Sequence, residues 1–210
     1  MNAVRVAVAF HSGRGHTAKF AAAVHAGAHG VPQTEAILIN VDKIGPHEWV
    51  QLDASDAIVF GSPTYMGSAS AAFHAFAQAT GRRWRTQAWR DKLAAGFTNS
   101  GSMAGDKSST LAYLATLAAQ HGMIWVNLGL RAGWNSTTGS EQDLNRLGFH
   151  HGAAAQSNVD EGPDAVHKSD LETAEYLGRR VAGYAHLVAA GRAAVAGQPS
   201  SRADALGVPR

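Results

Sequence analysis

The chain has 210 residues, of which 45% are hydrophobic and 16% are charged, a balance typical of one folded domain rather than a disordered chain. The formal net charge is +2 and the basic residues are scattered, which argues against nucleic acid as a partner. The absence of cysteine excludes disulfides, thiolate catalysis and cysteine-ligated metal sites. The N-terminus lacks the pattern of a signal peptide, and no apolar run approaches the roughly 20 residues of a membrane span, so we expect a cytoplasmic protein.

Short apolar runs alternate along the chain with alanine-rich segments that have helical spacing. Strands are predicted at residues 4–10, 37–39, 57–60, 93–97 and 123–128. Helices are predicted at residues 17–26, 46–52, 69–79, 109–121 and 170–190. We therefore expect a single domain over residues 1–190 and a flexible, solvated tail over residues 191–210.

The alternation of apolar strands and helices predicts an α/β fold with a parallel sheet covered on both faces. Five such units indicate a doubly wound five-stranded sheet in the order 2-1-3-4-5. In that architecture ligands bind beyond the carboxyl ends of the strands, where the strand order reverses. The loops after the first, third and fourth strands should therefore converge on one site.

The loop after the first strand, HSGRGHTA at residues 11–18, is the first candidate for a phosphate site. Hydroxyls and backbone N–H groups at a helix start can hold a phosphate monoester without metal. The residues that offer them are Ser12, Gly13, Arg14, Gly15, His16 and Thr17. In a purely structural interpretation, the two hydroxyl side chains only cap the helix.

The same loop matches other nucleotide and phosphate motifs only in part or not at all. GRGHTA fits the dinucleotide pattern G-x-G-x-x-G/A, but the acidic residue expected at the end of the second strand is displaced to Asp42. A P-loop is excluded because no lysine followed by serine or threonine occurs in the loop. A phospho-acceptor domain would need aspartates where the first and third strands end, and this chain has Phe10 with His11 and Phe60 with Gly61 there.

The other two loops add features that suit a flat ligand. The second offers an aromatic ring and a thioether on a proline-fixed backbone: Pro63, Thr64, Tyr65, Met66 and Gly67. The third offers small polar residues that allow close approach to the backbone: Ser100, Gly101 and Ser102. We expect no metal site, because His150 and His151 are adjacent and no H-E-x-x-H pattern occurs. A phosphate site beside a flat polar slot describes a pocket for FMN better than one for a sugar or a peptide.

Four stretches resemble the flavodoxin-like NAD(P)H:quinone oxidoreductases of the WrbA type. They are SGRGHTAKFA from residue 12, DAIVFGSPTYMGSASAAFHAFAQATG from residue 56, DKLAAGFTNSGS from residue 91 and TLAAQHGMIWVNLG from residue 116. The resemblance implies a flavodoxin-like fold, FMN phosphate at residues 12–17, and flavin-ring contacts at residues 63–67 and 100–102. It also implies that His121 stands beside the ring as a catalytic residue, that NADH or NADPH is the reductant, and that a quinone-like small molecule is the acceptor. A homo-oligomer, dimer or tetramer, is expected on the same ground.

Alternatives to this enzyme remain open at this point. The first is a flavodoxin-like electron carrier that binds FMN without a substrate of its own, and the second is an NAD-binding module that uses GRGHTA. His121 precedes a glycine at the end of a predicted helix, where any histidine would interact favourably with the helix dipole. The excursion over residues 130–168 is long enough to form the wall of a substrate site above the flavin.

Overall fold

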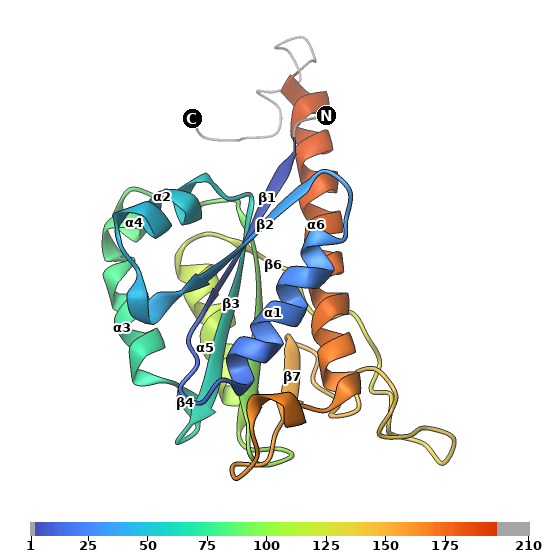
Figure 1. The fold of residues 1–210 in the computed structure, drawn as a ribbon. Coiled ribbons are helices and arrows are strands. Elements are labelled where there is room, and N and C mark those ends of the chain that lie inside the picture. The colour runs from blue at the N-terminus through green and yellow to red at the C-terminus, as the bar shows by residue number, and fades with distance from the viewer. Residues whose placement is uncertain (1–2, 197–210) are drawn as a thin grey trace.

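The computed structural model describes residues 3–196, and Figure 1 shows a central sheet with helices on both faces. The strands are β1 Val4–Phe10, β2 Thr34–Asn40, β3 Ala57–Tyr65, β4 Ser68–Ala69, β5 Leu93–Ser100, β6 Ile124–Trp125 and β7 Ala153–Gln156. The helices are α1 His16–His29, α2 Pro46–Ala54, α3 Ala71–Ala79, α4 Gly81–Arg85, α5 Lys107–Gln120 and α6 Lys168–Ala196, with 3₁₀ turns at Val41–Lys43 and Pro163–Ala165.

The main sheet is parallel and has the order β2-β1-β3-β5-β6, which confirms the predicted doubly wound fold. The central strands β1, β3 and β5 are buried on both faces over most of their length, and β3 and β5 begin with apolar runs and become polar toward the cleft. Valines of β1 face α1 and α6, while its alanines face the side covered by α3 and α5. Helices α1 and α6 approach closely through Gly27 and Gly178, where an added Cβ would lie 2.0 Å from a carbonyl oxygen of the other helix.

The fifth strand position is divided between two short strands, which the sequence did not predict. β6 pairs with Leu93 and Ala94, and β7 pairs further along β5 with residues 97–100. The strand predicted over residues 123–128 was therefore too long. Val126 still donates to the carbonyl of Ala94, and Gly129 follows with a φ of +69°, a conformation that favours glycine. Residues 126–152, which we call the insertion, separate β6 from β7 at this edge of the sheet.

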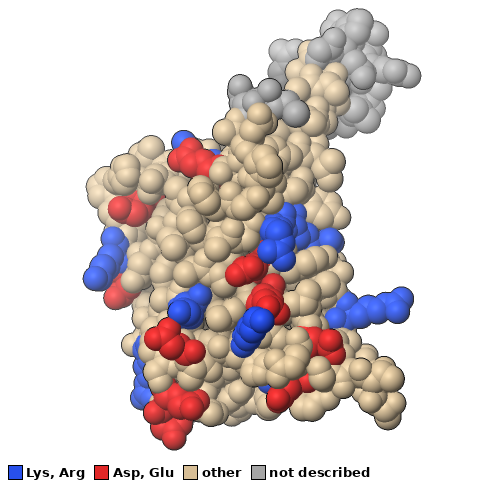
Figure 2. All heavy atoms as spheres, turned by 45° about the vertical axis from the view of Figure 1, so that its right-hand side comes forward, with Lys and Arg blue, Asp and Glu red and all other residues tan. Residues whose placement is uncertain are grey.

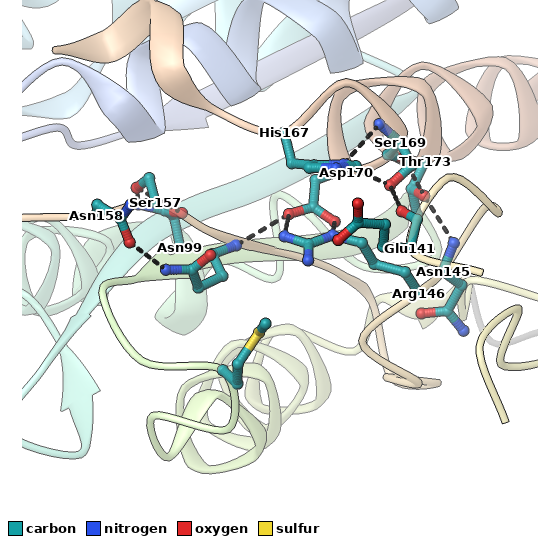
Figure 3. A network of polar contacts seen from close by, with 12 residues as sticks. Asn99, Glu141, Asn145, Arg146, Ser157, Asn158, His167, Ser169, Asp170 and Thr173 are labelled. Atoms are coloured by element: carbon teal, nitrogen blue, oxygen red, sulfur yellow. Dashed lines mark hydrogen bonds and ion pairs between the residues drawn. The ribbon is translucent and has the colours of Figure 1, made fainter. Parts of the chain in front are cut away.

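A buried polar network anchors the insertion to α6 (Figure 3). The guanidinium of Arg146 donates to both carboxylate oxygens of Asp170 at 2.8 Å, and the two side chains are 3% and 2% exposed. The same carboxylate accepts the backbone N–H of Gln156 in β7 at 3.0 Å. One buried acid thus joins the insertion, the divided strand and the start of α6.

The C-terminal helix is longer than predicted and begins slightly earlier. Residues 191–196, which the prediction assigned to a tail, continue α6, and residues 197–210 lie outside the described residues. Among the residues described, no helix has the length and apolar character needed to cross a membrane. The space-filling view in Figure 2 shows acidic and basic side chains interspersed over one face of the molecule.

Candidate functional site

A cleft of about 980 Å³ opens at the carboxyl ends of β1, β3 and β5, where the topology predicts a ligand site. Four segments line it. The lining residues are Gly13, Arg14, His16 and Thr17; Pro63, Thr64, Tyr65, Met66 and Gly67; Asn99, Ser100, Gly101, Ser102, Gly105 and Asp106; and Ser157, Asn158, Val159 and Asp160. The three predicted loops therefore do converge, and a fourth segment joins them.

The first loop leaves the start of α1 open to the cleft. Ser12 accepts a hydrogen bond from the backbone N–H of Gly15 at 3.1 Å and so holds the turn. Gly15 has φ +91°, which disfavours any other residue, and no side chain among the described residues caps the helix. Thr17, in the first turn, is buried and lines the cleft. Free N–H groups, a hydroxyl and the helix dipole together favour an anion here.

The second loop is a tight hairpin between β3 and β4. Met66 and Gly67 form its turn, and both have positive φ, +49° and +79°. Methionine rarely adopts this conformation, and here its side chain is fully exposed at the cleft, so backbone strain accompanies its placement. The hydroxyl of Tyr65 extends over Gly13, where a Cβ would lie 2.5 Å from it.

Three buried threonines support this hairpin from below. The hydroxyl of Thr64 lies 2.8 Å from those of Thr98 and Thr110, and Thr98 donates to the carbonyl of Ser62 at 2.7 Å. The network joins the second loop to β5 and to α5. Because the three hydroxyls are buried, these hydrogen bonds stabilise the position of the cleft wall.

The third loop is held by a buried lysine at the start of α5. The Nζ of Lys107 donates to the carbonyl oxygens of Ser102 and Met103, the latter at 2.9 Å. Burial lowers the pKa of Lys107 to about 8, while Asp170 raises it and Arg146 lowers it further. The loop also ends in Asp106, which has φ +53°.

The fourth segment lies within the excursion that was expected to form a wall of the site, but none of its residues was predicted individually. It packs directly on the first loop. The carbonyl of Val159 accepts from Arg14 at 3.3 Å, and that of Glu161 accepts from His16 at 2.9 Å. Lys19 pairs with Asp164 at 2.8 Å. Charge was the sequence signal that could have identified this segment. Residues 157–164, SNVDEGPD, are acidic, whereas the first loop and helix α1 carry cations.

Most of the predicted cofactor residues line the cleft. Those that do are Gly13, Arg14, His16, Thr17, Pro63, Thr64, Tyr65, Met66, Gly67, Ser100, Gly101 and Ser102. Ser12 and Gly15 do not line it and instead shape the turn. The excursion over residues 130–168, which is long enough to form the wall of a substrate site, lines the cleft through residues 157–160.

His121 does not line the cleft, contrary to the expectation that it stands beside a bound ring. Helix α5 starts at the cleft and runs back along the sheet, so its C-cap His121 lies near Asp91, just before β5 begins. The side chain is buried against Trp89, with ring centroids 4.7 Å apart, and its Nε2 lies 2.9 Å from the hydroxyl of Thr80. This position supports the structural interpretation of His121 and removes it from the candidate catalytic residues of this cleft.

The protonation state of His121 affects the stability of the fold. Thr80 already donates to the carbonyl of Ala77, so the Nε2 of His121 is the donor in their contact. The Nδ1 of His121 is buried and has no hydrogen-bond partner in the described part of the chain. Burial, and then the charge of Arg83, lowers the pKa of His121.

We expect this histidine to make the fold less stable in acid. As pH falls below about 6.5, His121 takes up a proton in the unfolded chain but not yet in the folded chain. The free energy of unfolding therefore decreases as pH falls from about 6.5 to the lower pKa that His121 has in the folded chain. Urea unfolding between pH 7.5 and 5 should give a steeper loss for the wild type than for His121→Gln. Parallel curves for the two proteins would contradict this assignment.

The cleft fits FMN in shape and donor chemistry. It combines an uncapped helix start with a hydroxyl for a phosphate, two glycine-rich backbone stretches for a flat ring, and an exposed aromatic side chain. Among the described residues no group of three or more His, Cys, Asp or Glu is placed to hold a metal ion.

Comparison with known proteins agrees with this fit. The family profile for NADPH-dependent FMN reductase matches residues 48–133. Flavodoxin FldP of Pseudomonas aeruginosa is 43% identical over 181 residues, covering 85% of this chain and 95% of that protein. An NAD(P)H dehydrogenase (quinone) of Archaeoglobus fulgidus is 32% identical over 199 residues, with coverages of 85% and 95%.

A solved structure supports the same relationship. The WrbA-like flavodoxin of Agrobacterium tumefaciens superposes with a TM-score of 0.70 and 38% identity, covering 88% of this chain and 99% of that one. Identity at this level over nearly the whole of both chains goes beyond a shared fold. The chain belongs to the WrbA-type family of flavodoxin-like, FMN-dependent oxidoreductases.

Proposed function

We propose that this protein oxidises NADH or NADPH and passes two electrons to a quinone or a similar small acceptor, with FMN as its cofactor. The balanced reaction takes up NAD(P)H, one proton and the quinone, and it releases NAD(P)⁺ and the quinol. The observation that carries the proposal is the open cleft of about 980 Å³ built from the four segments. This volume is near the upper end of the roughly 300–1,000 Å³ of small-molecule sites, so a second planar ring can enter beside the flavin.

The chain's own groups bind and orient rather than perform the redox step, which FMN supplies when it is bound. The α1 start with Thr17 would hold the phosphate. Residues 63–67 and 100–102 would hold the ring, with backbone N–H groups available to stabilise charge that develops on it. The exposed side chains of Tyr65 and Met66 offer an apolar surface to the nicotinamide and the quinone in turn.

An electron carrier is the second candidate, and the name of the 43%-identical relative, flavodoxin, favours it. A carrier exchanges electrons with protein partners and has no steady-state turnover with NAD(P)H alone. Carriers of this kind are usually acidic, whereas this chain has a formal net charge of +2. The predicted homo-oligomer does not distinguish an enzyme from a carrier, because residues of one chain form the cleft.

Steady-state kinetics with NADH or NADPH and benzoquinone distinguish the two functions. We expect turnover by the purified protein alone and parallel double-reciprocal lines, because both substrates use the same cleft in succession. Intersecting lines would show that the two substrates bind together and would contradict a shared site. Turnover that appears only after a separate reductase is added would identify a carrier.

A further inference from the structure

Lys107 is a buried cation that has no carboxylate partner within residues 3–196. It is fully buried, and the ion pairs found among residues 3–196 do not include it. Lysines are almost never fully buried unless they are paired. The neighbouring buried ions, Arg146 and Asp170, neutralise one another through two hydrogen bonds. The three groups therefore carry one uncompensated positive charge.

The ammonium contacts the rear of the third loop, since Lys107 itself does not line the cleft while Ser100, Gly101 and Ser102 do. Its Nζ holds the carbonyls of Ser102 and Met103, and its backbone N–H donates to the carbonyl of Ala104 at 3.2 Å. In a trans peptide the N–H points opposite to the carbonyl. The N–H groups of Met103 and Ala104 are therefore turned away from Lys107.

The insertion and α6 contribute the other groups near the ammonium of Lys107, which is fully buried. The ring of Phe149, from the insertion, has its centroid 5.9 Å from the Nζ, which is the geometry of a cation–π contact. Asp170 from α6 and Arg146 from the insertion are the charged groups that act on it, and Asp106 precedes it at the cleft rim. A charge in such dry surroundings acts on nearby groups with little screening.

We propose that Lys107 is a positioning residue for FMN: it fixes the third loop through Ser102 and Met103, and its buried charge favours the reduced over the oxidised cofactor. The two added electrons increase the negative charge of the ligand, so a buried cation behind the loop that contacts it stabilises the reduced form more. The inference rests on FMN as the cofactor, as proposed above. It does not depend on which acceptor the protein uses.

The test compares Lys107→Met, which keeps the length and removes the charge, with Lys107→Gln, which keeps a hydrogen-bond donor, and Lys107→Arg, which keeps the charge. Lys168→Met is the matched control, since that side chain is 83% exposed. The measurements are FMN affinity by fluorescence and the two-electron midpoint potential of the bound flavin at pH 6.5 and pH 9.5. Lys107→Gln also tests the charge if Lys107→Met fails to fold.

At pH 6.5 we expect Lys107→Met and Lys107→Gln to lower the midpoint potential by at least about 30 mV, which corresponds to a tenfold loss of preference for the reduced cofactor. Lys107→Arg and the control Lys168→Met should stay near the wild type. At pH 9.5 the gap should narrow, because the pKa of Lys107 is about 8 and the wild type has then lost most of its charge.

The outcomes separate this inference from the proposed function. A wild type that binds no FMN overturns both. Normal FMN binding with equal potentials in all variants overturns the charge role alone. A gap of the same size at both pH values would also overturn it, because the loop geometry and not the charge would then set the potential.

Discussion

Replacement of Thr17 by valine is expected to weaken FMN binding by roughly 10- to 100-fold while riboflavin binding stays within about twofold of the wild type. Valine keeps the size of the buried side chain and removes its hydroxyl. A hydrogen bond to a charged group contributes about 1.5–3 kcal/mol, and about 1.4 kcal/mol is tenfold in affinity. Riboflavin lacks the phosphate, so it reports any general damage to the cleft. Fluorescence titration of the apoprotein measures both ligands.

The matched control is Thr116→Val on the exposed side of α5, where the hydroxyl only bonds back to the carbonyl of Ala112. We expect it to bind both ligands like the wild type. Equal losses of FMN and riboflavin affinity in Thr17→Val would show that the change distorts the cleft. An unchanged FMN affinity would place the phosphate away from the start of α1.

Replacement of Asp170 by asparagine is expected to lower the free energy of unfolding by about 3–5 kcal/mol. The carboxylate of Asp170 accepts two hydrogen bonds from Arg146 and one from the backbone N–H of Gln156. The side chains of Arg146 and Asp170 are both buried. The variant leaves the guanidinium buried without its counter-ion. Urea denaturation of the wild type and the variant measures the difference.

Two further variants sharpen this prediction. The exposed pair of Glu175 and Arg179 is 3.5 Å apart on the same helix, and Glu175→Gln should cost less than about 0.5 kcal/mol. The double variant Arg146→Met with Asp170→Leu should lose less than Asp170→Asn alone, because neither member of the pair is left as a buried charge without the other. A greater loss in the double variant would mean that the pair contributes net stability beyond mutual neutralisation.

The sequence predicted those parts of the fold that local patterns determine. The β1 run Val4–Phe10 was predicted at both ends, and the rule that ligands bind at the carboxyl ends of parallel strands located three of the four cleft segments. The error over His121 was avoidable in principle. A helix that follows a parallel strand runs back along it, so the end of α5 must lie at the opposite edge from the cleft.

Other features could not be predicted because they depend on tertiary contacts. β7 has the sequence AAAQ, and alanine has little preference for strands, so its pairing with β5 depends on burial and on tertiary contacts such as that of Gln156 with Asp170. The ion pair of Arg146 with Asp170 joins residues 24 apart in the sequence, and nothing local marks either as buried. The fourth cleft segment follows directly from these contacts, since it begins where β7 ends.

The divided strand position also bears on how the protein avoids unwanted association. A long, flat edge strand with unpaired N–H and carbonyl groups can recruit strands of other chains into growing sheets. Here β6 has two residues and β7 has four, with the insertion between them, so this edge offers no continuous run for a further strand. The opposite edge is different: β2 has seven residues and exposes Leu38. Aggregation by sheet extension, when partial unfolding provokes it, should therefore begin at β2.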